Sequence, residues 1–193
     1  NFTSPEFNVN VCQLPFWALV VFYTWKSINY EKISDLILLG IFMSIGLLTK
    51  YLFIYLILTI KIIFLLHLLK KKNFNIRLLI PGTILILFLI PHLIWLYQND
   101  FTSIAYALNR TGIDETNFTN HLYNPFIFFA KQAGILIPVF IMLLTFIDIK
   151  KMNFKNLKKD RYFLLLINIL PIILIFLTSF ISGAKIRTMW MTP

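Results

Sequence analysis

The stretch Leu36–Leu69, LILLGIFMSIGLLTKYLFIYLILTIKIIFLLHLL, decides the fold of this chain. As one helix, its 34 residues would extend about 51 Å, far more than the ~30 Å hydrocarbon core that one crossing needs. Gly46 loosens a helix and Lys50 resists burial in lipid, so we expect a break within the sequence GLLTKY. The stretch therefore predicts a tight hairpin of two rather short transmembrane spans.

The rest of the chain has the composition of a membrane protein. Of its 193 residues, 59% are hydrophobic and 13% are charged, whereas soluble proteins have about 25% charged residues. Only helices and closed barrels satisfy their backbone groups in lipid, and long unbroken apolar runs favour helices. Four further runs are long enough to be spans: Val11–Trp25, Leu78–Tyr97, Pro125–Ile147 and Tyr162–Ile181. We expect an all-α, polytopic transmembrane helical bundle of about six spans.

The basic residues follow the apolar runs in a pattern that predicts orientation. Short loops rich in Lys and Arg remain cytoplasmic. Three such loops hold most of the basic residues: Lys26, Lys32, Lys70, Lys71, Lys72, Arg77, Lys150, Lys151, Lys155, Lys158, Lys159 and Arg161. Four segments then fall on the other, extracytoplasmic face: Asn1–Asn10, the Thr49–Lys50 turn, Gln98–Asn124 and the tail from Ser182. The net charge of +10 comes from basic residues that lie between apolar runs and do not form one solvated face. We therefore expect no nucleic-acid partner.

The longest of these external segments has helical periodicity. Its apolar residues recur at i, i+3, i+4 and i+7, at Phe101, Ile104, Ala105 and Leu108. Asp100 is placed to cap the start of such a helix, and Gly112 to end it. The pattern predicts a short external amphipathic helix over Phe101–Asn109, lying on the membrane surface.

Three external cations are candidate site residues. Lys185 and Arg187, near Trp190, break the positive-inside pattern. They are either headgroup anchors or a clamp for a lipid-linked phosphate. Lys50, predicted at the same depth and side, is either an ordinary turn lysine or a third contact to the same anion.

Carboxylates on the predicted external face offer general-base or metal chemistry. Glu6 and Asp100 lie near the external ends of two spans, where solvated carboxylates are also ordinary. The spacing of Asp114, Glu115 and His121 matches no metal-ligand pattern. We therefore predict no metal-ligating residue, and a divalent cofactor is left open.

Five stretches, taken in order, resemble one family. They are SPEFNVNVCQLPFWAL, LGIFMSIGLLTKY, IPHLIWLYQNDFTSIAYAL, FIFFAKQAGILIP and SGAKIRTMW. Together they are similar to segments of the polytopic, GT-C type glycosyltransferases that use lipid-linked sugars. This group includes dolichyl-phosphate-mannose-protein mannosyltransferase-like enzymes, aminoarabinose transferases acting on lipid A and galacturonosyltransferases acting on the lipopolysaccharide core.

The resemblance implies a multi-pass enzyme, in the plasma (inner) membrane if the protein is bacterial. Such an enzyme transfers a sugar from a polyprenyl-phosphate donor to a lipid, glycan or protein acceptor at the extracytoplasmic face. Lys50, Lys185 and Arg187 would then face the donor phosphate. Many relatives carry Thr-Pro-Asp where this chain has Ser4-Pro5-Glu6, so Glu6 supplies the carboxylate in one alignment, and in an alignment running to Asn10 the acid is absent.

The family's first external loop, with its catalytic carboxylate, has no counterpart in the chain. We therefore interpret residues 1–193 as part of one integral-membrane glycosyltransferase domain, truncated at both ends and inactive alone. Two alternatives stay open: a transporter or flippase for an amphipathic anion, and a non-catalytic pseudoenzyme. Transporters usually carry inverted repeats and sites near the midplane, whereas this sequence shows no repeat and collects its candidate charges at one interface.

Overall fold

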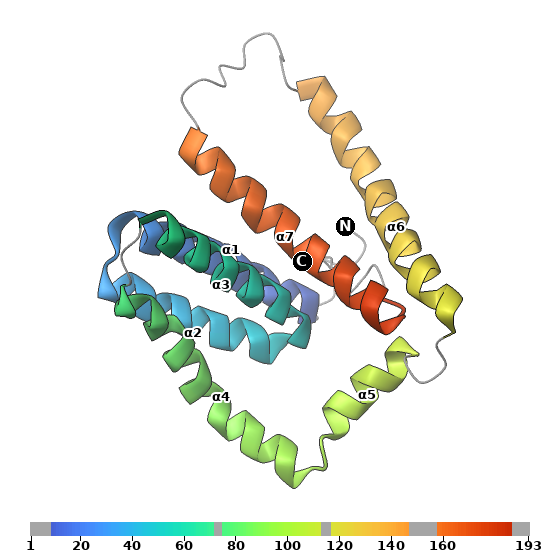
Figure 1. Cartoon of the computed structure of the whole chain (residues 1–193), viewed down its shortest axis with the longest axis horizontal. Coiled ribbons are helices and arrows are strands. Elements are labelled where there is room, and N and C mark those ends of the chain that lie inside the picture. The colour runs from blue at the N-terminus through green and yellow to red at the C-terminus, as the bar shows by residue number, and fades with distance from the viewer. Residues whose placement is uncertain (1–8, 72–74, 113–116, 147–157, 187–193) are drawn as a thin grey trace. The chain divides into compact units, whose positions relative to one another are not determined.

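The structure is a computed structural model that describes residues 9–71, 75–112, 117–146 and 158–186. All regular elements in these ranges are helices (Figure 1). The chain divides into two compact units, with the boundary between Tyr106 and Ala107. Each unit is described by itself.

The predicted hairpin at the centre of the first unit is confirmed. α2 (Ile33–Thr49) ends where Lys50 adopts an extended conformation with φ −161° and ψ 125°. The chain continues through a short 3₁₀ turn, η1 (Tyr51–Phe53), into α3 (Ile54–Lys71). The two helices run in opposite directions (Figure 1). The break therefore falls at the lysine, within the expected GLLTKY sequence.

Gly46 has a different role from the one expected. α2 continues through it for three more residues, so Gly46 does not interrupt the helix. A Cβ at this position would lie 2.5 Å from the ring of Phe53, which is fully buried. The missing side chain makes room for that ring, against which Trp17 packs edge-on with centroids 5.6 Å apart. Gly46 thus lets the turn fold back onto the end of α2.

α2 is the central helix of the first unit. It packs against both α1 (Val9–Tyr30) and α4 (Ile80–Gln98), which follows a 3₁₀ turn, η2 (Ile76–Leu79). At Gly40 an added Cβ would lie 2.8 Å from the Cβ of Ile84 on α4, so these two helices approach closely through a small residue. The unit's core is apolar and comes from several helices: Val20, Leu36, Leu39, Met43, Phe53, Leu56, Ile57, Ile60 and Leu85.

The second unit is built on a pair of antiparallel helices, α6 (Phe118–Phe146) and α7 (Lys158–Ser182). Phe128, Ile167 and Ile175 are buried in this unit. α7 ends at Ser182, and Gly183 follows with φ +68°, the left-handed conformation that commonly terminates helices.

The predicted amphipathic helix is present as α5 (Thr102–Thr111), shifted slightly along the chain. Asp100 is not its cap: Phe101 precedes the first helical residue, and its carbonyl accepts the N–H groups of Ile104 and Ala105, both at 2.9 Å. Gly112, with φ +66°, follows its end as expected. No residue of α5 is buried, so its apolar side chains are available to a membrane surface.

Length and hydropathy identify four helical segments in the described residues that could each cross a membrane. They are Tyr51–Lys71, Ile76–Gln98, Phe118–Leu144 and Asp160–Ser182, and α2 is a shorter apolar helix. α1 has 22 residues but includes the buried polar side chains Gln13, Thr24 and Ser27. The expected all-helical, polytopic integral membrane protein is thus confirmed, and about six spans agree with this set of helices.

Candidate functional site

Lys50 occupies the break between α2 and η1. Its ammonium donates a 2.6 Å hydrogen bond to Oδ1 of Asn10, at the start of α1. The side chain is half-buried, and burial lowers the pKa of Lys50 to about 8. At neutral pH the group is still mostly protonated, so the first unit holds a weakly hydrated cation at the end of a hydrophobic helix. Such a cation can stabilise an anion strongly.

An aromatic cluster lies next to Lys50 in the chain. The hydroxyl of Tyr51 is 2.9 Å from Nε2 of His92, and the His92 ring stacks on Trp95 with centroids 5.8 Å apart. His92 and Trp95 are one turn apart on α4, and that spacing alone could have indicated their stack. The pairing with Tyr51 has no signal in the sequence, because it depends on how the hairpin packs against α4.

Lys185 lies in the second unit, three residues after the end of α7, and its side chain is exposed. Its backbone N–H donates a 3.0 Å hydrogen bond to the carbonyl of Thr111, at the end of α5. Two residues earlier, the carbonyl of Gly183 accepts a 2.7 Å hydrogen bond from the Asn124 side chain on α6. Two segments predicted to share one face, Gln98–Asn124 and the tail from Ser182, are therefore in contact.

The other two candidate residues, Glu6 and Arg187, lie outside the described residues, as do Asp114, Glu115 and Trp190. Lys50 and Lys185 belong to different units, so their convergence on one phosphate stays a prediction. Within the ranges that the structure describes, no group of three His, Cys, Asp or Glu side chains is arranged to hold a metal. A divalent cofactor remains open.

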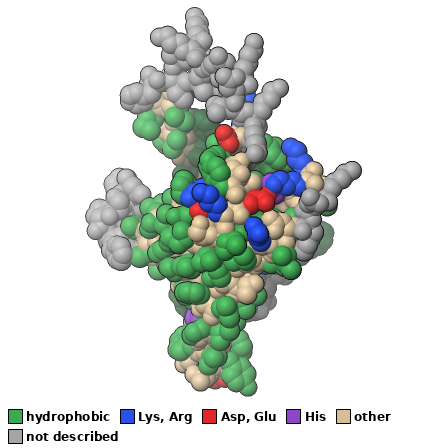
Figure 2. Space-filling view, turned by 90° about the vertical axis from the view of Figure 1, so that its left-hand side faces the viewer, with side chains coloured by type: hydrophobic (Ala, Val, Ile, Leu, Met, Phe, Trp, Pro, Cys, Tyr) green, Lys and Arg blue, Asp and Glu red, His purple; other side chains and the backbone are tan. Residues whose placement is uncertain are grey.

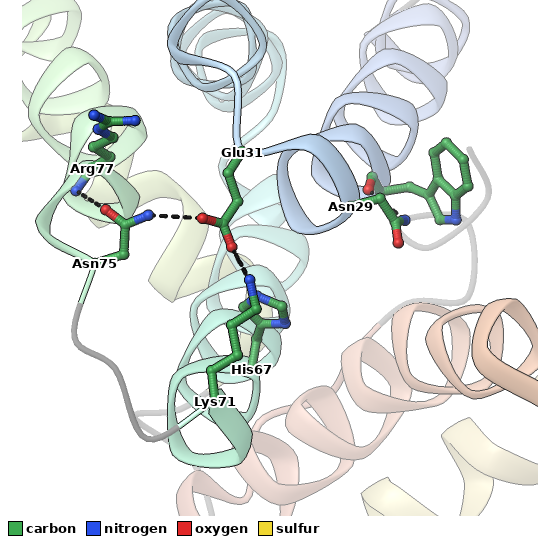
Figure 3. A network of polar contacts seen from close by, with 7 residues as sticks. Asn29, Glu31, His67, Lys71, Asn75 and Arg77 are labelled. Atoms are coloured by element: carbon green, nitrogen blue, oxygen red, sulfur yellow. Dashed lines mark hydrogen bonds and ion pairs between the residues drawn. The ribbon is translucent and has the colours of Figure 1, made fainter.

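Sequence reasoning missed a polar network at the opposite end of the first unit (Figure 3). Glu31, in the α1–α2 connection, forms an ion pair with Lys71 at the end of α3 and accepts a 3.0 Å hydrogen bond from the Asn75 side chain. His67 Nε2 lies 3.5 Å from the same carboxylate. These contacts, led by the hydrogen bond from Lys71, hold the pKa of Glu31 below its usual value.

A second ion pair lies at this end. Lys26 on α1 is 2.7 Å from the carboxylate of Asp35, which is buried in the first turn of α2. The Lys26 ammonium also lies over the rings of Phe22 and Tyr23. Figure 2 shows acidic and basic side chains gathered in one area of a largely apolar face. In the sequence, the signal for these pairs was the two acids Glu31 and Asp35, which lie close to Lys26 and Lys32 between two apolar runs.

Residues 1–95 match the family model described as dolichyl-phosphate-mannose-protein mannosyltransferase. No curated protein and no solved structure matches the chain. Over the residues that it covers, Lys50 among them, the match confirms the family resemblance seen in the sequence. The family points to a membrane glycosyltransferase that uses a polyprenyl-phosphate sugar. The motifs FIFFAKQAGILIP and SGAKIRTMW lie beyond the matched residues.

Proposed function

We propose that the chain is part of an enzyme that transfers a sugar from a polyprenyl-phosphate donor to a lipid, glycan or protein acceptor at the extracytoplasmic face. One observation carries this proposal: the part of the chain that matches the family contains a half-buried cation, Lys50, between the apolar helix α2 and the candidate membrane span that begins at Tyr51. Such a position suits a ligand whose phosphate lies at the interface while its isoprenoid tail remains in the bilayer.

The proposed chemistry is displacement at the anomeric carbon of the sugar with the polyprenyl phosphate as leaving group. Negative charge grows on the phosphate in the transition state, and fixed cations stabilise it. We assign this role to Lys50, Lys185 and Arg187. A carboxylate must accept the proton of the incoming hydroxyl, and we assign that role to Glu6 or to an acid outside this chain.

Lys185 is supported by its local structure. It lies three residues after the end of α7, in a tail that is attached to α5 and α6, whose connecting segment is predicted to be external. Its side chain remains exposed, so it is available to a ligand. The predicted sidedness itself derives from the Lys and Arg distribution, which also supports placing the active face outside the cytoplasm.

The proposal is tested by Arg187→Ala and Lys185→Ala in the full-length protein. We expect Arg187→Ala to reduce transfer from the donor about 10- to 150-fold, because a lost charge-assisted contact costs about 1.5–3 kcal/mol. Arg187→Lys should restore part of the activity if the guanidinium binds in a bidentate manner. The matched control is Arg77→Ala, which removes an exposed arginine from the predicted cytoplasmic end of the first unit. Normal turnover and donor affinity in both tail variants would instead identify the tail cations as headgroup anchors.

A further inference from the structure

We infer that Asn124 is a positioning residue for the phosphate-binding tail, setting the path of the backbone that carries Lys185. The inference rests on the proposed function, which assigns Lys185 and Arg187 to the donor phosphate. It concerns a residue whose side chain is hydrogen-bonded to the tail backbone, and that would act through the cations that follow.

The junction between α7 and the tail is held by side chains from two helices. The Asn124 carboxamide on α6 donates to the carbonyl of Gly183 at 2.7 Å. The hydroxyl of Ser179, fully buried on α7, donates to the carbonyl of Ala184 at 2.7 Å. Carbonyls after the last turn of a helix usually bind water or backbone groups. Here the carbonyls of two consecutive residues have side-chain donors, which restrain the path of the backbone as it leaves α7.

A third hydrogen bond continues this arrangement to the next residue. The N–H of Lys185 donates to the carbonyl of Thr111 at 3.0 Å. The backbone of residues 183, 184 and 185 is thus held in turn by α6, α7 and α5, whereas the Lys185 side chain is exposed. A cation on a restrained backbone loses less conformational entropy when it binds an anion. The junction therefore pre-organises the tail for its ligand.

Of the residues that hold this junction, Asn124 is the best one to substitute in a test of how the tail is positioned. It lies on a different helix from the tail, so its hydrogen bond fixes where the tail lies and not merely how α7 ends. Gly183 has φ +68°, the left-handed conformation that commonly ends a helix, so its carbonyl is not part of the α7 hydrogen-bond ladder. Without a donor at Asn124, that carbonyl would bind water and the tail could leave in other directions.

The kinetic test uses Asn124→Ala and the near-isosteric Asn124→Asp, which lacks the donor group. In the full-length protein we expect both to lower kcat/KM for the polyprenyl-phosphate donor about 10- to 100-fold, as small misplacements of catalytic groups do. The KM for the acceptor should not change. The matched control is Asn168→Ala, because the Asn168 carboxamide makes a hydrogen bond of equal length, 2.7 Å, but only to Leu164 within α7.

A coupling measurement separates positioning from simple stabilisation. In a Lys185→Ala/Arg187→Ala background, Asn124→Ala should lower activity less than 2-fold further, since its effect is exerted through those cations. If Asn124→Ala lowered activity by the same factor in this background as in the parent protein, the inference would be wrong and Asn124 would be a structural residue only. If the Lys185→Ala/Arg187→Ala variant retains normal donor kinetics, the proposed phosphate site itself is wrong and the inference falls with it.

A spin label tests the anchor without reference to activity. Cys12 is the single cysteine of residues 1–193, so a nitroxide is placed at Lys185→Cys in a background that lacks Cys12 and any cysteine outside these residues. Asn124→Ala should increase the mobility of that label, and Asn168→Ala should not. Unchanged mobility would refute the anchoring role of Asn124 while leaving the proposed function intact.

Discussion

The two ends of the first unit treat charge in different ways. At one end, Lys71 pairs with Glu31 and Lys26 pairs with Asp35, so each cation meets a carboxylate from another helix or connection. At the other end, the half-buried Lys50 donates to the neutral amide of Asn10. Partner contacts lower the pKa of Glu31 and so favour its charged form, whereas burial lowers the pKa of Lys50 and disfavours its charged form.

Glu31 is a charge that stabilises the fold, whereas Lys50 is a charge that the folded protein holds at a cost in stability. A depressed carboxylate pKa means that ionised Glu31 stabilises the native state. A depressed lysine pKa means that protonated Lys50 is less stable in the native state than in the unfolded chain. A group kept charged at such a cost is a candidate for function.

The largest effect should come from removing the Lys50 charge. Lys50→Met should lower kcat/KM for the donor about 10- to 150-fold, because the proposed contact to the donor phosphate is lost. Thermal stability should change little, because the lost hydrogen bond to Asn10 is offset by removal of the cost of burying the charge. In the unsubstituted protein, kcat/KM should fall as pH rises through about 8, where Lys50 loses its proton. Lys50→Arg should extend activity to higher pH. Wild-type donor kinetics in Lys50→Met would remove Lys50 from the proposed site.

A smaller effect, confined to stability, should follow from Lys26→Met. This substitution leaves the Asp35 carboxylate buried without its cation, which should lower the free energy of unfolding by about 1–3 kcal/mol. Asp35→Asn in the same protein should recover part of the loss. Unfolding in a denaturing detergent, monitored by tryptophan fluorescence, measures both. If Lys26→Met reduced donor affinity with unchanged stability, the contrast between the two ends would fail.

The smallest effect should come from Glu31→Gln, since Lys71 is half exposed and such pairs contribute about 0.2–1 kcal/mol. The pKa of Glu31 is depressed, so its contribution is present above the unfolded value near 4.3 and is lost as pH falls through the folded value. The melting temperatures of Glu31→Gln and the parent protein should differ at pH 7 and converge under acid conditions. A difference that persists at low pH would indicate a packing effect.

The helices were largely predictable because lipid imposes a strong pattern on sequence. Long apolar runs predicted the helices, four of which could each cross a membrane within the described residues, and the interruption of one run by a lysine located the hairpin break at Lys50. The period of the apolar residues after Asn99 likewise predicted α5. What failed was local detail: Phe101 holds the position given to Asp100, and Gly46 accommodates a ring that lies seven residues later.

The candidate site was less predictable, because its contacts join residues far apart in the chain. Lys50 could be selected from its place in an apolar run, but its hydrogen bond to Asn10 and the Tyr51–His92 pair depend on helix packing. The tail cations stood out against the charge pattern, yet nothing in the sequence connected Asn124 to Gly183, 59 residues later. Charge patterns locate ends of helices, and packing decides which ends meet.

Because α2 is short, the thickness of the membrane should affect how deeply Lys50 is buried. Its 17 residues rise about 26 Å, a few ångströms less than the ~30 Å hydrocarbon core of a typical bilayer. Such hydrophobic mismatch is relieved when the bilayer thins around the helix or when flanking side chains reach toward the headgroups. We therefore expect a thinner bilayer to bring the Lys50 ammonium nearer to water and a thicker one to draw it toward hydrocarbon. On this account, the length of the lipid acyl chains should influence the charge of this lysine.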